Sequence, residues 1–138
     1  MPTSAELLLD TSAALALVQP SHDRHEAVMI TVKGKALGLA GHALIETYSV
    51  LTRLPGAPRV APATAARIVR TNFPGSHALS TEGALSAVPE LQAADVSGGA
   101  VYDGLVALAA READVRLITC DRRAMPTYAR LGVDALLV

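Results

Sequence analysis

The stretch LLLDTSAALAL, residues 7–17, joins three leucines to one aspartate and then to an Ala-rich run. Three consecutive leucines are typical of a short strand that is buried on both faces, as in a parallel sheet. The run from Thr11 is typical of a helix, which we expect to end before Pro20. Asp10 therefore lies between a strand and a helix, where it can cap the helix or take part in a metal site. The choice depends on whether other strands end in the same way.

The rest of the chain alternates between short apolar segments and longer runs with helical spacing. Strands are predicted over 36–41, 116–120 and 133–138. Helices are predicted over 21–34, 42–54, 62–73, 97–115 and 125–132, and a strand leading into a helix is compatible with 74–89. This alternation indicates an α/β fold: a three-layer α/β/α sandwich around a mostly parallel central sheet. Residues 1–138 contain no repeat and no linker, so we expect a single domain.

The composition excludes several classes of protein. No apolar run approaches the roughly 18 residues of a membrane span, and the N-terminal MPTSAELLLD lacks the basic region of a secretory signal. Cys120 is the only cysteine, so an internal disulfide framework is excluded and a reducing cytoplasm is the expected location. Because 51% of the residues are hydrophobic, we expect part of the surface to be covered by a partner protein or by a second copy of the chain.

The net charge of −1 does not indicate a globally basic nucleic-acid-binding protein, but the charges are segregated. Residues 47–81 contain no acid and include Arg53, Arg59, Arg67 and Arg70. Residues 71–110 contain no Lys or Arg and include Glu82, Glu90, Asp95 and Asp103. The first segment suits an anionic ligand and the second a cation, although arginines on a solvated helix face would give the same pattern.

A second predicted strand also ends in an aspartate, because Asp121 follows residues 116–120. In an open α/β sheet, side chains that follow the strands meet in a crevice at the carboxyl edge. Glu46, among apolar neighbours in the helix 42–54, and Asp103, in the first turn of the helix 97–115, can join them there. Asp103 alone is also explained by the preference of a helix N-terminus for negative charge.

Four carboxylates in one place raise one another's pKa unless a cation lies between them. Oxygen ligands with several retained waters suit Mg²⁺ or Mn²⁺, and such an ion supports hydrolysis of a phosphodiester. Ser12 and Thr119 each lie two positions from an acid and could orient a ligand or a water molecule. For these two hydroxyls, a cap and an ordinary strand residue are the simpler interpretations.

The stretches LLLDTSAALAL, HALIETYSVLTRLP, VYDGLVALAA and LITCDRRA together resemble the PIN-domain ribonucleases, and most closely the VapC toxins of bacterial toxin–antitoxin pairs. The resemblance spans nearly the whole chain in the right order. It implies a Mg²⁺- or Mn²⁺-dependent endoribonuclease that forms a homodimer and is inhibited by a small cognate antitoxin. The acidic positions of the family correspond to Asp10, Glu46, Asp103 and Asp121, and its hydroxyl position to Thr119. Residues 55–96 carry no family motif, so substrate choice is expected to differ there.

Chemistry and resemblance together assign roles. Asp10 and Asp103 are expected to be the main metal ligands, with Asp121 contributing directly or through water, and Glu46 to hold a metal-bound water or act as the base. RNA phosphates are expected to contact arginines; the candidates are Arg53, Arg59, Arg67, Arg70, Arg122 and Arg123. With three tyrosines, one phenylalanine and no tryptophan, base stacking is expected to contribute little.

Two alternatives stay open beside the toxin. One is a PIN nuclease of RNA processing that has no antitoxin, and the other is a catalytically silent PIN-like binding module. The presence of all four acids argues against the silent module. His42 is interpreted as a surface residue or a residue at the start of the helix 42–54.

Overall fold

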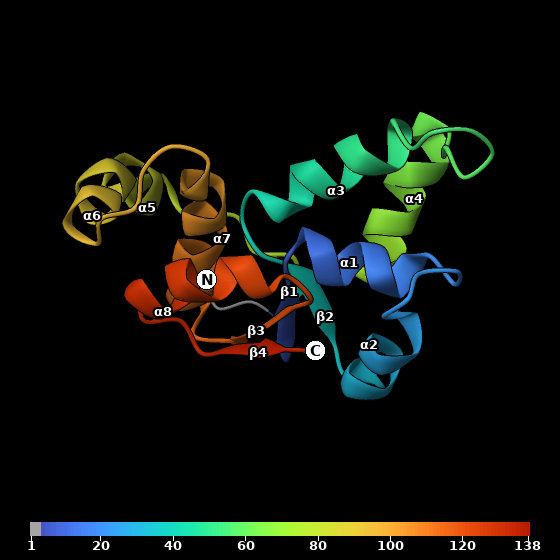
Figure 1. Cartoon of the computed structure of the whole chain (residues 1–138), viewed down its shortest axis with the longest axis horizontal. Coiled ribbons are helices and arrows are strands. Elements are labelled where there is room, and N and C mark those ends of the chain that lie inside the picture. The colour runs from blue at the N-terminus through green and yellow to red at the C-terminus, as the bar shows by residue number, and fades with distance from the viewer. Residues whose placement is uncertain (1–3) are drawn as a thin grey trace.

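A computed structural model describes residues 4–138 of the chain, with helices arranged around a small sheet (Figure 1). In chain order the elements are β1 (Leu7–Leu9), α1 (Thr11–Val18), α2 (His25–Val32), β2 (Leu37–Leu39), α3 (Ala43–Thr52), α4 (Pro62–Asn72), α5 (Thr81–Leu85), α6 (Ala87–Ala93), α7 (Ala100–Ala113), β3 (Arg116–Thr119), the 3₁₀ helix η1 (Arg122–Ala124), α8 (Met125–Arg130) and β4 (Ala135–Leu137). The strands and helices predicted from the sequence are found with ends that shift by a few residues, except that no strand forms within 74–89.

The four strands of the described chain form one parallel sheet in the order β2-β1-β3-β4. Leu8 pairs with Gly38 on one side and with Leu117 on the other, and Ile118 pairs with Leu136. The strand order switches at β1, because β2 is added on one side of it and β3 and β4 on the other. The predicted α/β sandwich with a mostly parallel sheet is confirmed, and the crevice is expected where β1 and β3 end.

The helices cover the sheet in groups. Helix α1 packs on β1 and β3, α7 packs on β3, and α8 packs on β4. Helix α3 packs against α1 and α4, and α8 packs against α7. Figure 1 shows α3 and α4 as an arm beside α1, and α5 and α6 beside α7 on the opposite side of the molecule.

The central strands form the middle of the core. Leu8, Leu9, Leu117 and Ile118 are fully buried, as expected for parallel strands covered on both faces. These strands are rigid anchors for any side chain that follows them directly.

The predicted strand within 74–89 is reduced to an extended edge segment. A single parallel bridge pairs Ala40 with His77, and the N–H of His77 donates to the carbonyl of Leu39 (2.9 Å). The segment lies so close to β2 that a Cβ on Gly38 would come 2.2 Å from the carbonyl oxygen of Gly75. Only glycine fits at position 38.

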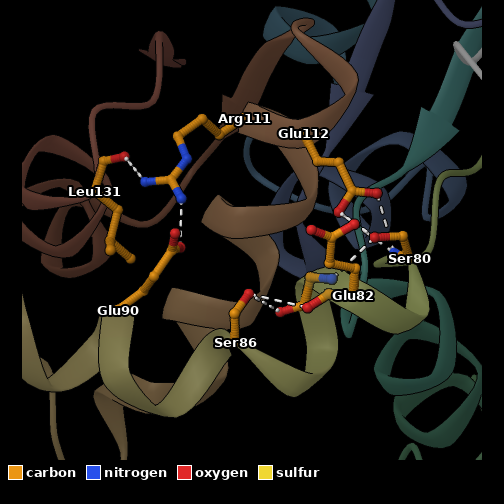
Figure 2. Close-up of polar contacts among 8 residues, drawn as sticks. Ser80, Glu82, Ser86, Glu90, Arg111, Glu112 and Leu131 are labelled. Carbon is orange, nitrogen blue, oxygen red and sulfur yellow. Dashed lines mark hydrogen bonds and ion pairs between the residues drawn. The ribbon is translucent and has the colours of Figure 1, made fainter.

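The C-terminal half of α7 holds the α5–α6 region through charged side chains (Figure 2). Glu112 accepts hydrogen bonds from the backbone N–H of Ser80 (3.0 Å) and from its Oγ (3.1 Å). Arg111 forms an ion pair with Glu90 and donates to the carbonyl of Leu131 (3.1 Å). Every charge in this group has a partner of opposite sign or a hydrogen bond, so this half of α7 serves the fold.

Across residues 4–138, each helix is too short or too polar to span a lipid bilayer.

Candidate active site at the carboxyl ends of β1 and β3

Asp10 lies directly after β1 and caps α1. Its backbone N–H donates to the carbonyl of Ile118 (3.1 Å), which fixes it between the two central strands. Its Oδ1 accepts a hydrogen bond from the N–H of Ala13 (3.0 Å), and the residue is only 4% exposed. The interpretation of Asp10 as a helix cap is therefore correct. It does not exclude a second role, because each carboxylate oxygen accepts more than one hydrogen bond or ligand.

The second oxygen of Asp10 is held by Tyr128 of α8. The hydroxyl of Tyr128 donates to Oδ2 of Asp10 (2.8 Å), and the ring is buried. Burial raises the pKa of Tyr128 above its ordinary value, and the charge of Asp10 and the hydrogen bond to it act in the same direction. Tyr128 thus stays protonated and acts as a fixed donor.

Ser12 and Thr119 connect the ends of the two central strands. The Oγ of Ser12 donates to Oδ1 of Asp10 (2.6 Å) and accepts from the N–H of Cys120 (2.9 Å). The Oγ1 of Thr119 lies 3.3 Å from the Oγ of Ser12 and accepts from the N–H of Asp121 (3.0 Å). Both hydroxyls are more than a cap and an ordinary strand residue, because together they orient Asp10 and the backbone of Asp121.

Asp121 follows β3 and begins η1. Its Oδ1 accepts a hydrogen bond from the N–H of Arg123 (2.9 Å) and lies 3.9 Å from the Nε of the same residue. The side chain of Arg123 is 97% exposed, so solvent screens most of this attraction. The carboxylate of Asp121 is therefore only weakly paired with Arg123.

The pKa of Asp103 indicates that this residue lies near the other three acids. Burial, and after it the charges of Asp121, Asp10 and Glu46 in that order, raise the pKa of Asp103 to about 6. The first turn of α7 and the N-terminal part of α3 thus bring their acids to the crevice at the ends of β1 and β3. Burial also raises the pKa of Asp10, although its hydrogen-bond donors act in the opposite direction.

The apolar neighbours of Glu46 in α3 are buried only in part. Ala43, Thr47 and Leu51 face the interior, but Ile45 is 66% exposed. The buried residues are four apart and form one narrow stripe, so the residues beside that stripe are turned toward solvent. Glu46 lies on this margin with its side chain 40% exposed.

The chemistry of the cluster fits a hard divalent cation. All of the donors are oxygen atoms, and the repulsion that raises the pKa of Asp103 is relieved by positive charge. Within residues 4–138, no three side chains of His, Cys, Asp or Glu gather their donor atoms closely enough to enclose an ion. Mg²⁺ does not need such a cage, because it keeps several water ligands and takes only one or two carboxylates.

Comparison with known proteins identifies the family. The model of the PIN domain matches residues 7–131. Ribonuclease VapC27 of Mycobacterium tuberculosis is 44% identical over 131 residues, which cover 95% of this chain and 96% of the relative. The chain belongs to the VapC ribonucleases of the PIN-domain family.

Solved structures of VapC proteins share the fold. The sarcin–ricin loop cleaving toxin VapC20 of Mycobacterium tuberculosis superposes with a TM-score of 0.67 at 20% identity, covering 92% of this chain and 95% of that one. VapBC2 of Rickettsia felis, bound to a DNA fragment from its promoter, gives a TM-score of 0.64 at 13% identity, covering 94% and 98%. At these identities the likeness concerns the fold alone.

The predicted RNA-binding arginines of this VapC-type domain lie in two places. Arg53 at the end of α3 and Arg67 and Arg70 on α4 are exposed on the α3–α4 arm, and Arg122 is exposed in η1, next to Asp121. Among the described residues, the ion pairs between a candidate arginine and the four acids are limited to that of Arg123 with Asp121.

Three residues near the acids escaped the sequence reasoning. Tyr128 lies 118 positions from Asp10, and no local pattern marks it. Arg24 lies close enough for its charge to lower the pKa of the Cys120 thiol, against the larger raising effects of burial and of Asp10. His42 is more than a helix-start residue, because its Nε2 lies 4.0 Å from Oε2 of Glu46. The i, i+4 spacing of His42 and Glu46 was the available signal for this last contact.

Proposed function

We propose that this VapC-type domain, acting as one unit over residues 1–138, cleaves RNA endonucleolytically with Mg²⁺ or Mn²⁺ as its cofactor. The reaction takes place at Asp10, Glu46, Asp103 and Asp121. The observation that carries the proposal is the raised pKa of Asp103, which reflects burial among three other acids. A fold that keeps such acids together, with only the exposed Arg123 and the partly exposed His42 as basic ion-pair partners among the described residues, is suited to a cation and a polyanionic substrate.

Asp10 and Asp103 are the proposed main ligands, and Asp121 contributes directly or through water. When bound, the ion polarises the scissile phosphate and lowers the pKa of a water molecule. Glu46 orients the attacking water or accepts its proton, since its side chain is 40% exposed and so is open to solvent. Ser12, Thr119 and Tyr128 hold the carboxylate of Asp10 in one orientation and so keep the site pre-organised.

The substrate is RNA, as the names of the relatives suggest for those proteins. Arg53, Arg67, Arg70 and Arg122 are proposed to contact its phosphates, because exposed arginines bind phosphate oxygens with paired N–H groups. Arg122 adjoins Asp121, whereas the other three arginines lie on the α3–α4 arm, so the proposed phosphate contacts fall at two places.

The cleavage test uses the purified full chain and total cellular RNA, with Mg²⁺, Mn²⁺ or EDTA. Asp103→Asn is the preferred inactive variant, because Asp10→Ala also removes a helix cap at a cost of about 1 kcal/mol. Glu112→Gln is the matched control on the same helix. Discrete metal-dependent products are expected from the wild type and Glu112→Gln, and none from Asp103→Asn. No cleavage by folded wild-type protein with either metal, or equal cleavage by Asp103→Asn, would favour the silent binding module.

We further propose that the protein is the toxin of a toxin–antitoxin pair, acts in the cytoplasm and forms a homodimer. Its similarity to VapC27 and the likeness of its fold to the VapBC2 complex support a small antitoxin as partner. Expression of the wild type, but not of Asp103→Asn, is expected to arrest growth, and co-expression of a small gene directly upstream to restore it. RNA cleavage without growth arrest would favour the RNA-processing nuclease instead.

A further inference from the structure

Two aromatic side chains meet beside the acids. The ring centroids of His42 and Tyr102 are 5.0 Å apart, and the ring planes are inclined by 33°. Tyr102 is 55% exposed, the highest value for an aromatic residue in the described chain, so much of its ring is open to solvent. Tyr128 and Phe73 are buried, and Tyr48 is 38% exposed in a hollow beside α4.

The position of the pair ties it to the proposed site. Tyr102 directly precedes Asp103 in the first turn of α7, and His42 is the residue before α3. His42 also reaches toward Glu46, with 4.0 Å between Nε2 and Oε2. The two rings thus bridge the two helices that bring Glu46 and Asp103 into the cluster, and they form part of its rim.

At this rim, an RNA strand needs a favourable contact that does not involve its negatively charged phosphates. Four carboxylates repel the phosphates that approach them, and the exposed arginines lie on the α3–α4 arm and in η1. A nucleobase is neutral, and its stacking on an aromatic ring is insensitive to that repulsion. Within a duplex the base faces are already covered, so only an unpaired base can use such a ring.

We propose that Tyr102, braced by His42, is the stacking surface for an unpaired nucleobase next to the cleaved phosphodiester. This inference rests on the proposed ribonuclease function and adds to it a residue that positions the substrate beside the cleaved bond. It departs from the expectation from composition that stacking contributes little, since one exposed ring at the rim is enough for one base.

The binding test uses the full chain with Asp10→Asn, which keeps the RNA uncut, and a fluorescein-labelled random-sequence 16-nucleotide single-stranded RNA in Mg²⁺. Tyr102→Leu is expected to weaken binding about 5- to 10-fold, the lower end of the loss for one stacked base. Tyr102→Phe keeps the ring and is expected to bind as the parent does. Tyr48→Leu is the matched control at a second exposed tyrosine and is expected to leave affinity unchanged.

The absence of tryptophan gives a second, direct measurement. RNA is expected to quench the tyrosine fluorescence of the parent and of Tyr48→Phe, but not that of Tyr102→Phe. The Tyr102→Phe variant also serves as the control for light absorbed by the RNA. A duplex of the same length is expected to quench little. Equal affinity of Tyr102→Leu and the parent, or a quench that persists in Tyr102→Phe, would overturn the proposal.

Kinetics separate this inference from the proposed function. In the chain with Asp10 restored, Tyr102→Leu is expected to raise KM about 5- to 10-fold with little change in kcat. A fall in kcat without a change in KM would mean that Tyr102 only supports the fold of the site. If the wild type shows no metal-dependent cleavage, the ribonuclease proposal itself fails, whatever Tyr102 does.

Discussion

The two ends of α7 carry acids with opposite behaviour. At the N-terminal end, burial and three neighbouring carboxylates raise the pKa of Asp103 to about 6. At the C-terminal end, burial is the largest single influence and raises the pKa of Glu112, but the hydrogen bonds from Ser80 and His77 and the charge of His77 together outweigh it, so the net shift is downward. One helix thus presents an acid whose charge is opposed by its surroundings and another whose charge is stabilised by them.

The difference between the two acids separates a residue that stabilises the fold from a residue that is a candidate for function. Glu112 is paired and joins α7 to the segment before α5, so the fold gains from its charge (Figure 2). Asp103 is unfavourable in its charged form when no cation is bound, so its placement lowers stability. A residue whose charge lowers the stability of the fold is a candidate for function. The Arg111–Glu90 and Glu112–Ser80 contacts, in contrast, are explained by the stability that they give to the fold.

The largest expected effect is at the N-terminal end. Asp103→Asn should lower RNA cleavage at least about 100-fold, because even partners of metal ligands cost 10- to 100-fold when removed. The same change should raise the free energy of unfolding by about 1 kcal/mol in metal-free buffer, after allowance for solvent screening of a half-exposed group. Initial rates and urea titrations measure the two quantities. If Asp103→Asn loses stability together with activity, the charge of Asp103 does not lower stability and its contrast with Glu112 is wrong.

A positioning effect is expected at Tyr128. Tyr128→Phe removes the hydrogen bond to Oδ2 of Asp10 and should raise the Mg²⁺ concentration needed for half-maximal cleavage about 10- to 100-fold. Activity should return at high Mg²⁺, because the ligand is misoriented and not lost. Tyr48→Phe, outside this contact, serves as the control. An unchanged Mg²⁺ requirement would show that Asp10 needs no support from α8.

At the C-terminal end the expected loss is in stability. Glu112→Ala removes the acceptor for Ser80 and His77 and should lower the free energy of unfolding by about 1–2 kcal/mol. The kcat/KM of the folded enzyme should stay unchanged. A double-mutant cycle with Ser80→Ala checks the pair, and additive losses would mean that the two residues do not stabilise one another.

The smallest effect is in the pH dependence of stability. The folded pKa of Asp103 lies above its unfolded value of 3.8, so the folded state binds more protons between these values. Stability should therefore fall as pH rises from about 4 through about 6 without divalent metal, and this slope should be smaller in Asp103→Asn.

Glu112 should behave in the opposite way. Its folded pKa lies below the ordinary value of 4.5, so its contribution is present above that value and is lost as pH falls through the folded pKa. Thermal melts of the wild type and of Glu112→Gln from pH 3 to 7 test this. A difference that grows toward neutral pH agrees with the sign, and one that grows toward acid contradicts it.

Local sequence patterns were sufficient for much of the fold. Leu7–Leu9 and the Ala-rich runs give strands and helices through burial, and the residues after β1 and β3 reach the switch point because parallel strands share one carboxyl edge. The segment 74–89 was ambiguous because its pairing with β2 is a single bridge at His77, too short to leave an alternating pattern.

The sequence by itself determined the order of the elements and the four acids that a parallel sheet brings toward one edge. Only the tertiary structure decided which acids are paired. Asp103 and Glu112 stand in similar Ala-rich helical surroundings, yet Ser80 and His77 stabilise one and other carboxylates oppose the other. The contacts of Tyr128 with Asp10 and of Tyr102 with His42 were decided in the same way. The physical reason is that such contacts join elements far apart in the chain, and the strand order and helix packing that bring them together are global properties.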